Sequence, residues 1–151
     1  TAFIIDVFSR AIVGWKVSTR MNTDMVLAAL EQALHDRGMP NNVIHHSDRG
    51  VQYLSIRYTN RLEAANLRAS VGTTGDSYDN ALAETVNGLY KTEVIEYLKA
   101  DWRGLGDIQL ATLNLVDWFN KERIHSSLGY VSPFDFEAMY YDKINPLGQV
   151  A

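Results

Sequence analysis

The stretch Val43-Ile44-His45-His46-Ser47-Asp48-Arg49-Gly50 decides the fold of this chain. Its apolar start predicts a short strand over Val43–His46, which delivers Ser47 and Asp48 to the carboxyl end, where open α/β sheets bind ligands. A second stretch, Tyr78-Asp79-Asn80-Ala81-Leu82-Ala83-Glu84, begins a helical pattern and offers another acid, Glu84, with 35 residues between it and Asp48. Two such acids from separate segments predict an α/β protein with a magnesium-dependent phosphoryl-transfer site.

The helix predicted from about Asp79 to Leu98 has two different faces. One side is apolar and carries Leu82, Val86 and Leu89, whereas the other is polar and carries Asn80, Glu84, Asn87 and Lys91. Lys91 follows Glu84 by two helical turns, so both residues share one face. We therefore expect Glu84 to face away from the core, with a basic residue beside it along the helix.

Hydrophobic periodicity predicts the other elements in chain order. Thr1–Val17 is typical of an antiparallel hairpin that turns at Ser9-Arg10. A helix follows, capped by Thr23 and stopped by Gly38. The remaining expected elements are a helix over Ile56–Ala65, a strand over Leu67–Thr73, a helix over Ile108–Glu122 with Leu115, Val116 and Phe119 as its core face, and a short helix after Pro133. Because the chain has neither repeats nor linkers, residues 1–151 predict one domain.

Composition narrows the class of protein. With 151 residues and 46% hydrophobic content the chain can bury a core of its own. It has no cysteine, which excludes disulfides and thiolate zinc sites and favours the cytoplasm. Its longest apolar runs, such as Ala2–Ile5, are far shorter than a membrane span.

Net charge limits the mode of nucleic-acid binding. A formal charge of −4 argues against a surface that grips nucleic acid all over. Local basic patches remain possible: one segment holds Arg49, Arg57, Arg61 and Arg68, and another holds Lys121, Arg123 and His125. The ordinary interpretation of both clusters is a solvated face.

The expected chemistry explains why acids matter here. Phosphodiester cleavage needs an oxygen nucleophile, charge stabilisation at phosphorus and help for the leaving oxygen, which two divalent ions roughly 4 Å apart supply. Mg²⁺ prefers oxygen ligands, so about three carboxylates from separate segments usually hold the ions. Asp48 and Glu84 are two candidates for this role.

Neighbouring polar residues allow more than one interpretation. An isolated acid is normally a solvated surface residue, and only the local sequences raise Asp48 and Glu84 above that. His45 and His46 point to opposite faces of a strand and cannot easily chelate one ion, so a structural role is favoured, with His46 a weaker candidate for lining the site. For Asp79, a helix cap is favoured over metal ligation.

At these residues the chain closely resembles the catalytic core of bacterial insertion-sequence transposases related to retroviral integrases, the rve group. The resemblance covers nearly the whole chain. It is carried by Asp6-Val7-Phe8-Ser9-Arg10, Ile12-Val13-Gly14-Trp15, His46-Ser47-Asp48-Arg49-Gly50-Val51-Gln52-Tyr53, Ser77-Tyr78-Asp79-Asn80-Ala81, Glu84, Lys91, Trp118-Phe119-Asn120, Arg123, His125-Ser126-Ser127-Leu128-Gly129-Tyr130 and Ser132-Pro133, in order and spacing.

The resemblance implies a ribonuclease-H-like fold with a five-stranded mixed sheet, and a transposase that nicks element ends and joins the freed 3′-hydroxyl to target DNA. It implies that Asp48 and Glu84 are the second and third acids of an Asp, Asp, Glu site for Mg²⁺ or Mn²⁺, with two ions expected. Lys91 resembles the residue that contacts element-end DNA, and Asn80 and Arg49 are further candidates for DNA contact. It also implies a homo-oligomer on DNA.

One departure from the family pattern concerns the first acid. In the family this Asp lies on a strand upstream of the block that begins at Asp6, so we expect it to precede Thr1. Asp6 is an alternative first acid, although a structural role is favoured for it. The strand expected upstream is the central one, and the sheet of this chain should therefore lack its centre.

Two rival functions stay open. One is a metal-dependent nuclease on the same scaffold that hydrolyses DNA without joining it. The other is a catalytically incomplete fragment that binds DNA or a sister subunit.

Overall fold

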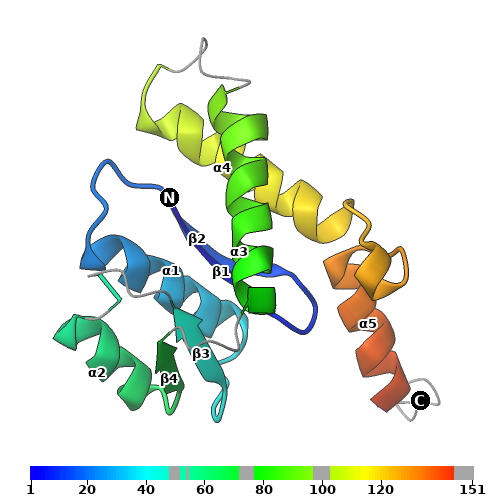
Figure 1. Ribbon diagram of the computed structural model, residues 1–151, viewed down its shortest axis with the longest axis horizontal. Coiled ribbons are helices and arrows are strands. Elements are labelled where there is room, and N and C mark those ends of the chain that lie inside the picture. Colours follow the sequence, from blue (N-terminus) through cyan, green and yellow to red (C-terminus); the bar gives the residue numbers. More distant parts are fainter. Residues whose placement is uncertain (48–51, 54, 72–76, 97–102, 145–151) are drawn as a thin grey trace.

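The computed structural model of the chain (Figure 1) describes residues 1–47, 52–53, 55–71, 77–96 and 103–144, with only the backbone at 70–71 and 77–80. Its strands are β1 (Ala2–Ile5), β2 (Ile12–Lys16), β3 (Ile44–Ser47) and β4 (Arg68–Val71). Its helices are α1 (Thr23–Asp36), α2 (Ile56–Ala64), α3 (Ser77–Tyr90), the π-helix η1 (Lys91–Glu96), α4 (Leu105–Lys121), the 3₁₀-helix η3 (Ser126–Leu128) and α5 (Pro133–Ile144). None of the described helices is both long and apolar enough to span a membrane.

The predicted hairpin is confirmed and forms the middle layer of one half of the molecule. β1 pairs antiparallel with β2, with Phe3 opposite Trp15 and Ile4 opposite Gly14. Residues directly opposite each other share a face of the sheet. Ala2 and Ile4 accordingly pack toward α1, whereas Phe3 packs on the other side, against α3 and α4.

Gly14 sets how closely β2 approaches α1. A Cβ at this position would stand 2.3 Å from the carbonyl oxygen of Ala29 and 3.0 Å from the Cβ of Ala33. Since no other residue type leaves this space free, glycine allows the strand and the helix to touch through their backbones. The smallness of Ala29 and Ala33 on the buried face of α1 serves the same contact.

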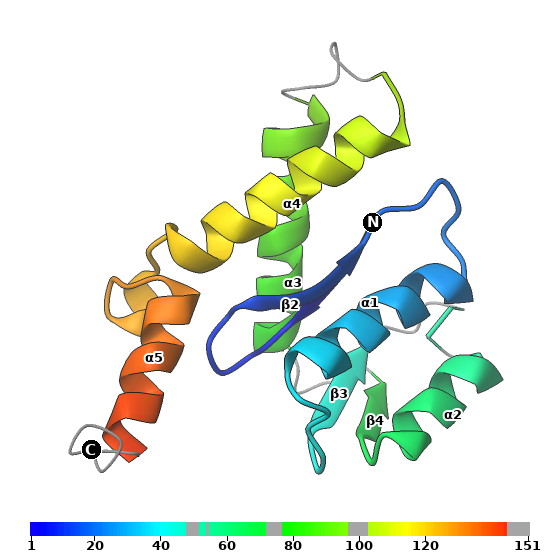
Figure 2. The ribbon, with the colours of Figure 1, turned by 180° about the vertical axis from the view of Figure 1, so that it is seen from behind.

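α3 and α4 cover the opposite face of the hairpin, as Figures 1 and 2 show from either side. Their cluster contains Val86 of α3 and Val116 and Phe119 of α4, packed with Ile12 of β2. The predicted apolar faces of both helices are therefore confirmed: Leu82, Leu115, Val116 and Phe119 are all at most 8% exposed. On the polar side, Glu84, Asn87 and Lys91 are exposed.

The second half of the molecule is a β–α–β unit. β3 and β4 are parallel, with His45 opposite Ala69, and α2 connects them. Tyr58 and Leu62 of α2 join Met25 and Leu30 of α1 in one buried cluster. α1 therefore packs against both halves and holds them together.

The described strands form two separate two-stranded sheets. The five-stranded sheet implied by the resemblance is thus not present among the described residues. One edge of β1 and one edge of β3 have no strand beside them in that part of the chain. The central strand expected upstream of Thr1 stays a prediction.

Two helix starts differ from the sequence prediction. α1 is capped by Asn22 and not by Thr23, because the Asn22 side chain accepts the Met25 N–H at 3.1 Å. α4 begins at Leu105, three residues earlier than expected. Asp107 explains this extra turn, since its carboxylate accepts the Arg103 N–H at 2.9 Å and satisfies a backbone donor ahead of the helix.

The long helix that carries Glu84 also differs in detail. α3 begins at Ser77, so Asp79 lies inside the helix and the prediction of Asp79 as its cap is wrong. After Tyr90 the helix continues as a π-helix. The change coincides with Thr92, whose hydroxyl donates to the Gly88 carbonyl at 3.0 Å and competes with the regular ladder. α5 has 12 residues and is longer than the short helix expected.

Candidate active site

The candidate site lies where the carboxyl end of β3 faces the amino-terminal half of α3 (Figures 1 and 2). β3 ends at Ser47, and Asp48 and Arg49, which follow directly, lie outside the described residues. Asn80 lies in the first turn of α3, where only the backbone is described. β3 therefore leads the chain toward α3 immediately before the first of the two predicted acids.

Glu84 and Lys91 occupy the outer face of the helix. Glu84 lies in the middle of α3, and Lys91 is the first residue of η1. Both side chains are exposed, while Leu82 and Val86 on the opposite side are buried. A carboxylate held on a rigid helix and free of the core is available to bind a cation, and Lys91 adds a positive charge two turns further on.

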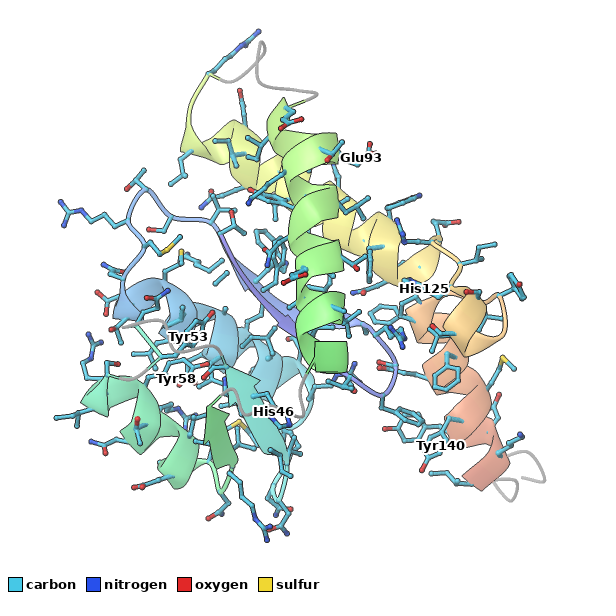
Figure 3. The ribbon with its side chains drawn as sticks, viewed as in Figure 1. His46, Tyr53, Tyr58, Glu93, His125 and Tyr140 are labelled. Carbon is cyan, nitrogen blue, oxygen red and sulfur yellow. The ribbon has the colours of Figure 1, made fainter. Side chains whose placement is uncertain are left out.

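His45 and His46 point to opposite faces of β3, as expected. Figure 3 shows Tyr53 and Tyr58 on the α2 side of β3 and His46 on the other side. The His45 Nε2 lies 2.8 Å from the Tyr58 hydroxyl, and their rings are 5.6 Å apart. His45 therefore has a structural contact and does not share a site with His46.

The electrostatics of this contact assign its proton. Burial, with a smaller contribution from the charge of His46, lowers the pKa of His45 to about 4. Burial raises the pKa of Tyr58. At neutral pH the hydroxyl therefore donates and the neutral imidazole accepts through Nε2.

Asp6 makes structural contacts in the hairpin turn. Its Oδ1 accepts the Phe8 N–H at 2.9 Å, and its Oδ2 lies 3.8 Å from the Arg37 guanidinium. Arg37 in turn binds Glu137 of α5 through two hydrogen bonds of 3.0 and 2.5 Å. Asp6 thus belongs to a network that joins the hairpin, α1 and α5.

Three residues of the two basic clusters form ion pairs within the protein. Arg57 pairs with Asp24 at 2.8 Å, Arg61 pairs with Glu31, and Lys121 pairs with Asp117 at 2.6 Å. These pairs tie α2 to α1 or lie along α4. They support the ordinary interpretation of a solvated face for these three residues.

Arg123 and His125 lie against the end of α4. The Arg123 guanidinium stacks over the rings of Trp118 and Phe119, at 5.9 and 5.7 Å from their centroids, and His125 meets the edge of Phe119 at 5.1 Å. Burial, followed by the charges of Arg123 and Arg10, lowers the pKa of His125. The closing sequence block therefore builds the corner between α4 and α5.

Sequence reasoning did not find the residues that close the outer edge of β2. Asn120 of α4 makes two hydrogen bonds to the backbone of Ile12, and the Gln32 side chain of α1 accepts the Trp15 N–H at 2.6 Å. The available signal was Asn120 itself, a polar residue next to Phe119 on the core face of a helix. Buried amides of this kind require partners.

The donor set fits a divalent cation in its chemistry. Asp48 and Glu84 offer carboxylate oxygens, the ligands that Mg²⁺ and Mn²⁺ prefer. Among the described residues no three His, Cys, Asp or Glu side chains gather into a metal-binding group, and Asp48 lies outside that part. Glu84 is the described carboxylate of the pair.

Comparison with protein families identifies the class of protein to which this fold belongs. Two models of the Integrase core domain match the chain, one over residues 1–77 and the other over residues 65–133. The chain belongs to the integrase core domain family.

Named relatives are bacterial transposases. The chain is 53% identical to the transposase for insertion sequence element IS629 of Shigella sonnei, over 95% of this chain and 47% of that protein. It is 41% identical to transposase InsF for insertion sequence IS3A of Escherichia coli, over 90% of this chain and 47% of that protein. The chain therefore spans about half the length of these relatives.

Solved structures show the same fold. The HTLV-2 integrase catalytic core domain in complex with magnesium superposes with a TM-score of 0.68 at 17% identity, over 87% of this chain and 80% of that one. The catalytic core domain of BIV integrase superposes with a TM-score of 0.67 at 15% identity, over 94% of this chain and 88% of that one. The expected ribonuclease-H-like fold is thereby confirmed.

Proposed function

We propose that this chain is the larger part of a DNA transposase catalytic core, which cleaves DNA and joins the cut end to a target. The observation that carries the proposal is the exposed Glu84 on α3, opposite the end of the strand that leads into Asp48, in a member of the integrase core family. Such an enzyme would work on DNA in the cytoplasm.

Asp48 and Glu84 would hold two Mg²⁺ or Mn²⁺ ions, which when bound supply charge neutralisation at phosphorus and a more acidic water. The chain's own contribution is position: α3 is packed on the hairpin through Val86, which keeps Glu84 in place. Lys91 would bind phosphate oxygens of element-end DNA, with Arg49 and Asn80 as further contacts. In joining, a DNA 3′-oxygen bonds to a target phosphorus while the target's own 3′-oxygen leaves.

We also propose that a further strand, which would carry the first acid, completes the sheet between β1 and β3. Trp15 turns its N–H away from β1 toward Gln32, which makes Phe3–Trp15 a non-hydrogen-bonded pair. The N–H and C=O of Phe3 therefore point to the open edge of β1. Side chains close the outer edge of β2, whereas no described strand pairs with this edge.

The proposed partners are DNA and further copies of this chain. An open groove of about 530 Å³ lies between β2, α1 and α4, lined by Trp15, Gln32, Leu110 and Leu113 among others. Leu110 and Leu113 are 59% and 49% exposed. Apolar side chains on an exposed helix face support an interface between copies.

Calorimetry with Mn²⁺ on this chain tests the metal assignment directly. We expect Mn²⁺ binding that is lost in Glu84→Gln and Asp48→Asn and kept in Asp6→Asn. Binding that depends on Asp6 would instead make Asp6 the first acid, and binding indifferent to Glu84 would refute the proposal.

A joining assay separates the proposed transposase from its two rivals. The polypeptide is given duplexes with free 3′-hydroxyl ends from its own element, plasmid DNA and Mn²⁺. Covalent joining supports a transposase, nicking without joining supports a nuclease, and DNA binding without either supports a non-catalytic fragment. The assay requires a form that includes the strand proposed between β1 and β3.

A further inference from the structure

The position of β3 along its own axis depends on few contacts. The strand has four residues and, within the described part of the chain, pairs with β4 alone, in the register that sets His45 opposite Ala69. No described strand pairs with its other edge. On one face Ile44 is 53% exposed and His46 is exposed as well. His45 lies on the opposite face and is less exposed than these two residues.

His45 provides a polar anchor on that face. Its Nε2 accepts the Tyr58 hydroxyl at 2.8 Å, and its ring packs at 5.6 Å from the Tyr58 ring. Tyr53 packs against Tyr58 from another side, edge to face at 5.4 Å. The contact joins a short strand to the first turn of a helix, 13 residues later in the chain.

Tyr58 is itself held rigidly. Its side chain is 0% exposed and belongs to the buried cluster that α1 and α2 share. The Ser55 hydroxyl accepts the Tyr58 N–H at 3.2 Å and caps α2, and Arg57 and Arg61 bind α2 to α1. The Tyr58 hydroxyl that binds His45 is therefore held in a fixed position.

We propose that the Tyr58–His45 hydrogen bond is a positioning contact that sets where β3 ends, at Ser47, one residue before the predicted metal ligand Asp48. This inference rests on the proposed function, since it assigns a purpose to the placement of the strand end that leads into Asp48. Two residues of strand, about 7 Å, lead from His45 to Ser47, so a shift of the anchor passes along an extended backbone to the end of β3. Metal ligands must be held to about 0.5 Å, which a four-residue ladder on one edge supports poorly.

Amide hydrogen exchange by NMR on this chain tests the proposal without relying on activity. Tyr58→Phe removes only the hydroxyl and keeps the ring. The matched control is Tyr90→Phe, which removes another buried hydroxyl, bonded to Thr1 and Thr112 at 2.8 and 3.2 Å and located away from β3. The two variants are compared under conditions that give them the same global free energy of unfolding. We expect amide exchange at Ile44–Ser47 to be about 10-fold faster in Tyr58→Phe than in Tyr90→Phe.

A conservative variant at the other partner sharpens the test. His45→Gln retains an acceptor for the hydroxyl and should preserve slow exchange in β3, whereas His45→Leu should behave like Tyr58→Phe. If the wild-type chain binds Mn²⁺, Tyr58→Phe should raise the Kd for Mn²⁺ by about 10-fold, because the loss of an orienting contact has this effect in other metal sites.

The outcomes distinguish this inference from the proposed function. Equal exchange at β3 in Tyr58→Phe and Tyr90→Phe would overturn the positioning role, whatever the metal data show. Faster exchange confined to β3, in a chain that binds no Mn²⁺, would support the anchor and refute the metal site. Faster exchange together with weaker Mn²⁺ binding supports both.

Discussion

The side-chain amide of Asn120 makes the two hydrogen bonds to Ile12 that a neighbouring strand would make. The Ile12 N–H donates to Oδ1 at 2.8 Å, and Nδ2 donates to the Ile12 carbonyl at 2.9 Å, across 108 residues of chain. Together with Gln32 on Trp15, this contact occupies the outer edge of β2. The hairpin is thereby closed to strand addition on that side and open on the side of β1.

Asn120→Ala should destabilise the fold by about 2–4 kcal/mol, because it leaves two buried backbone groups of Ile12 without partners. Asn120 is 4% and Ile12 3% exposed, so water cannot replace the lost bonds. Urea unfolding measures the change. Asn114→Ala, an exposed change in the same helix, is the control and should stay within about 0.5 kcal/mol of wild type. Equal midpoints for both variants would contradict the edge-closing role.

Gly14→Ala should cost about 1–3 kcal/mol or more, because its Cβ would stand 2.3 Å from the Ala29 carbonyl and force β2 and α1 apart. The paired control is Gly88→Ala in α3, where a Cβ meets nothing within 4 Å. That change should stabilise the chain by up to about 1 kcal/mol, since alanine favours helix. Thermal unfolding distinguishes the opposite signs, and a neutral Gly14→Ala would refute the close approach.

Stability should fall as the pH drops from about 6.5 toward 4, in part through His45. Its pKa is lowered to about 4 on folding, so the unfolded chain binds the extra proton in this window and is favoured there. Protonation of His45 also removes the acceptor of the Tyr58 hydroxyl. The lowered pKa of His125 acts in the same direction.

The contribution of His45 to this pH dependence is measured by the slope of the free energy of unfolding against pH. His45→Gln should flatten the curve between pH 4 and 6.5 relative to wild type, leaving the part due to other groups such as His125 and Glu31. An unchanged slope in His45→Gln would show that the imidazole is not held neutral by the fold.

Glu137→Gln should loosen α5 from the rest of the fold. It weakens two hydrogen bonds to Arg37, a pair whose side chains are only 15% and 26% exposed. Removing one partner of a largely buried pair leaves the other charge unsatisfied, and we expect a loss of about 1–3 kcal/mol. The exposed pair of Arg57 and Asp24 serves as control, because Arg57→Gln should cost less than about 1 kcal/mol. Proteolysis within 133–144 would report the loosening.

Glu84→Gln should abolish Mn²⁺ binding without destabilising the fold. Glu84 is exposed on α3, so the melting temperature should remain within about 2 °C of wild type. Mn²⁺ binding and DNA joining should both be lost. A variant that keeps either of them would remove Glu84 from the proposed site.

Local patterns in the sequence determined the elements and their inner faces. The spacing of Leu115, Val116 and Phe119 requires one buried side of α4, and the apolar runs on both sides of Ser9-Arg10 require a hairpin. These features follow from the periods of helices and strands, which depend on near neighbours in the chain. The opposite directions of His45 and His46 follow in the same way.

Tertiary structure alone decided the partners. The packing of distant elements decides three contacts: Asn120 with Ile12, Gly14 with Ala29, and His45 with Tyr58. Helix starts were misjudged for a related reason, because several residues near each end can cap a helix and geometry selects one, as with Asn22 over Thr23. Sequence periodicity specifies which side of an element is buried, and only three-dimensional packing specifies what that side touches.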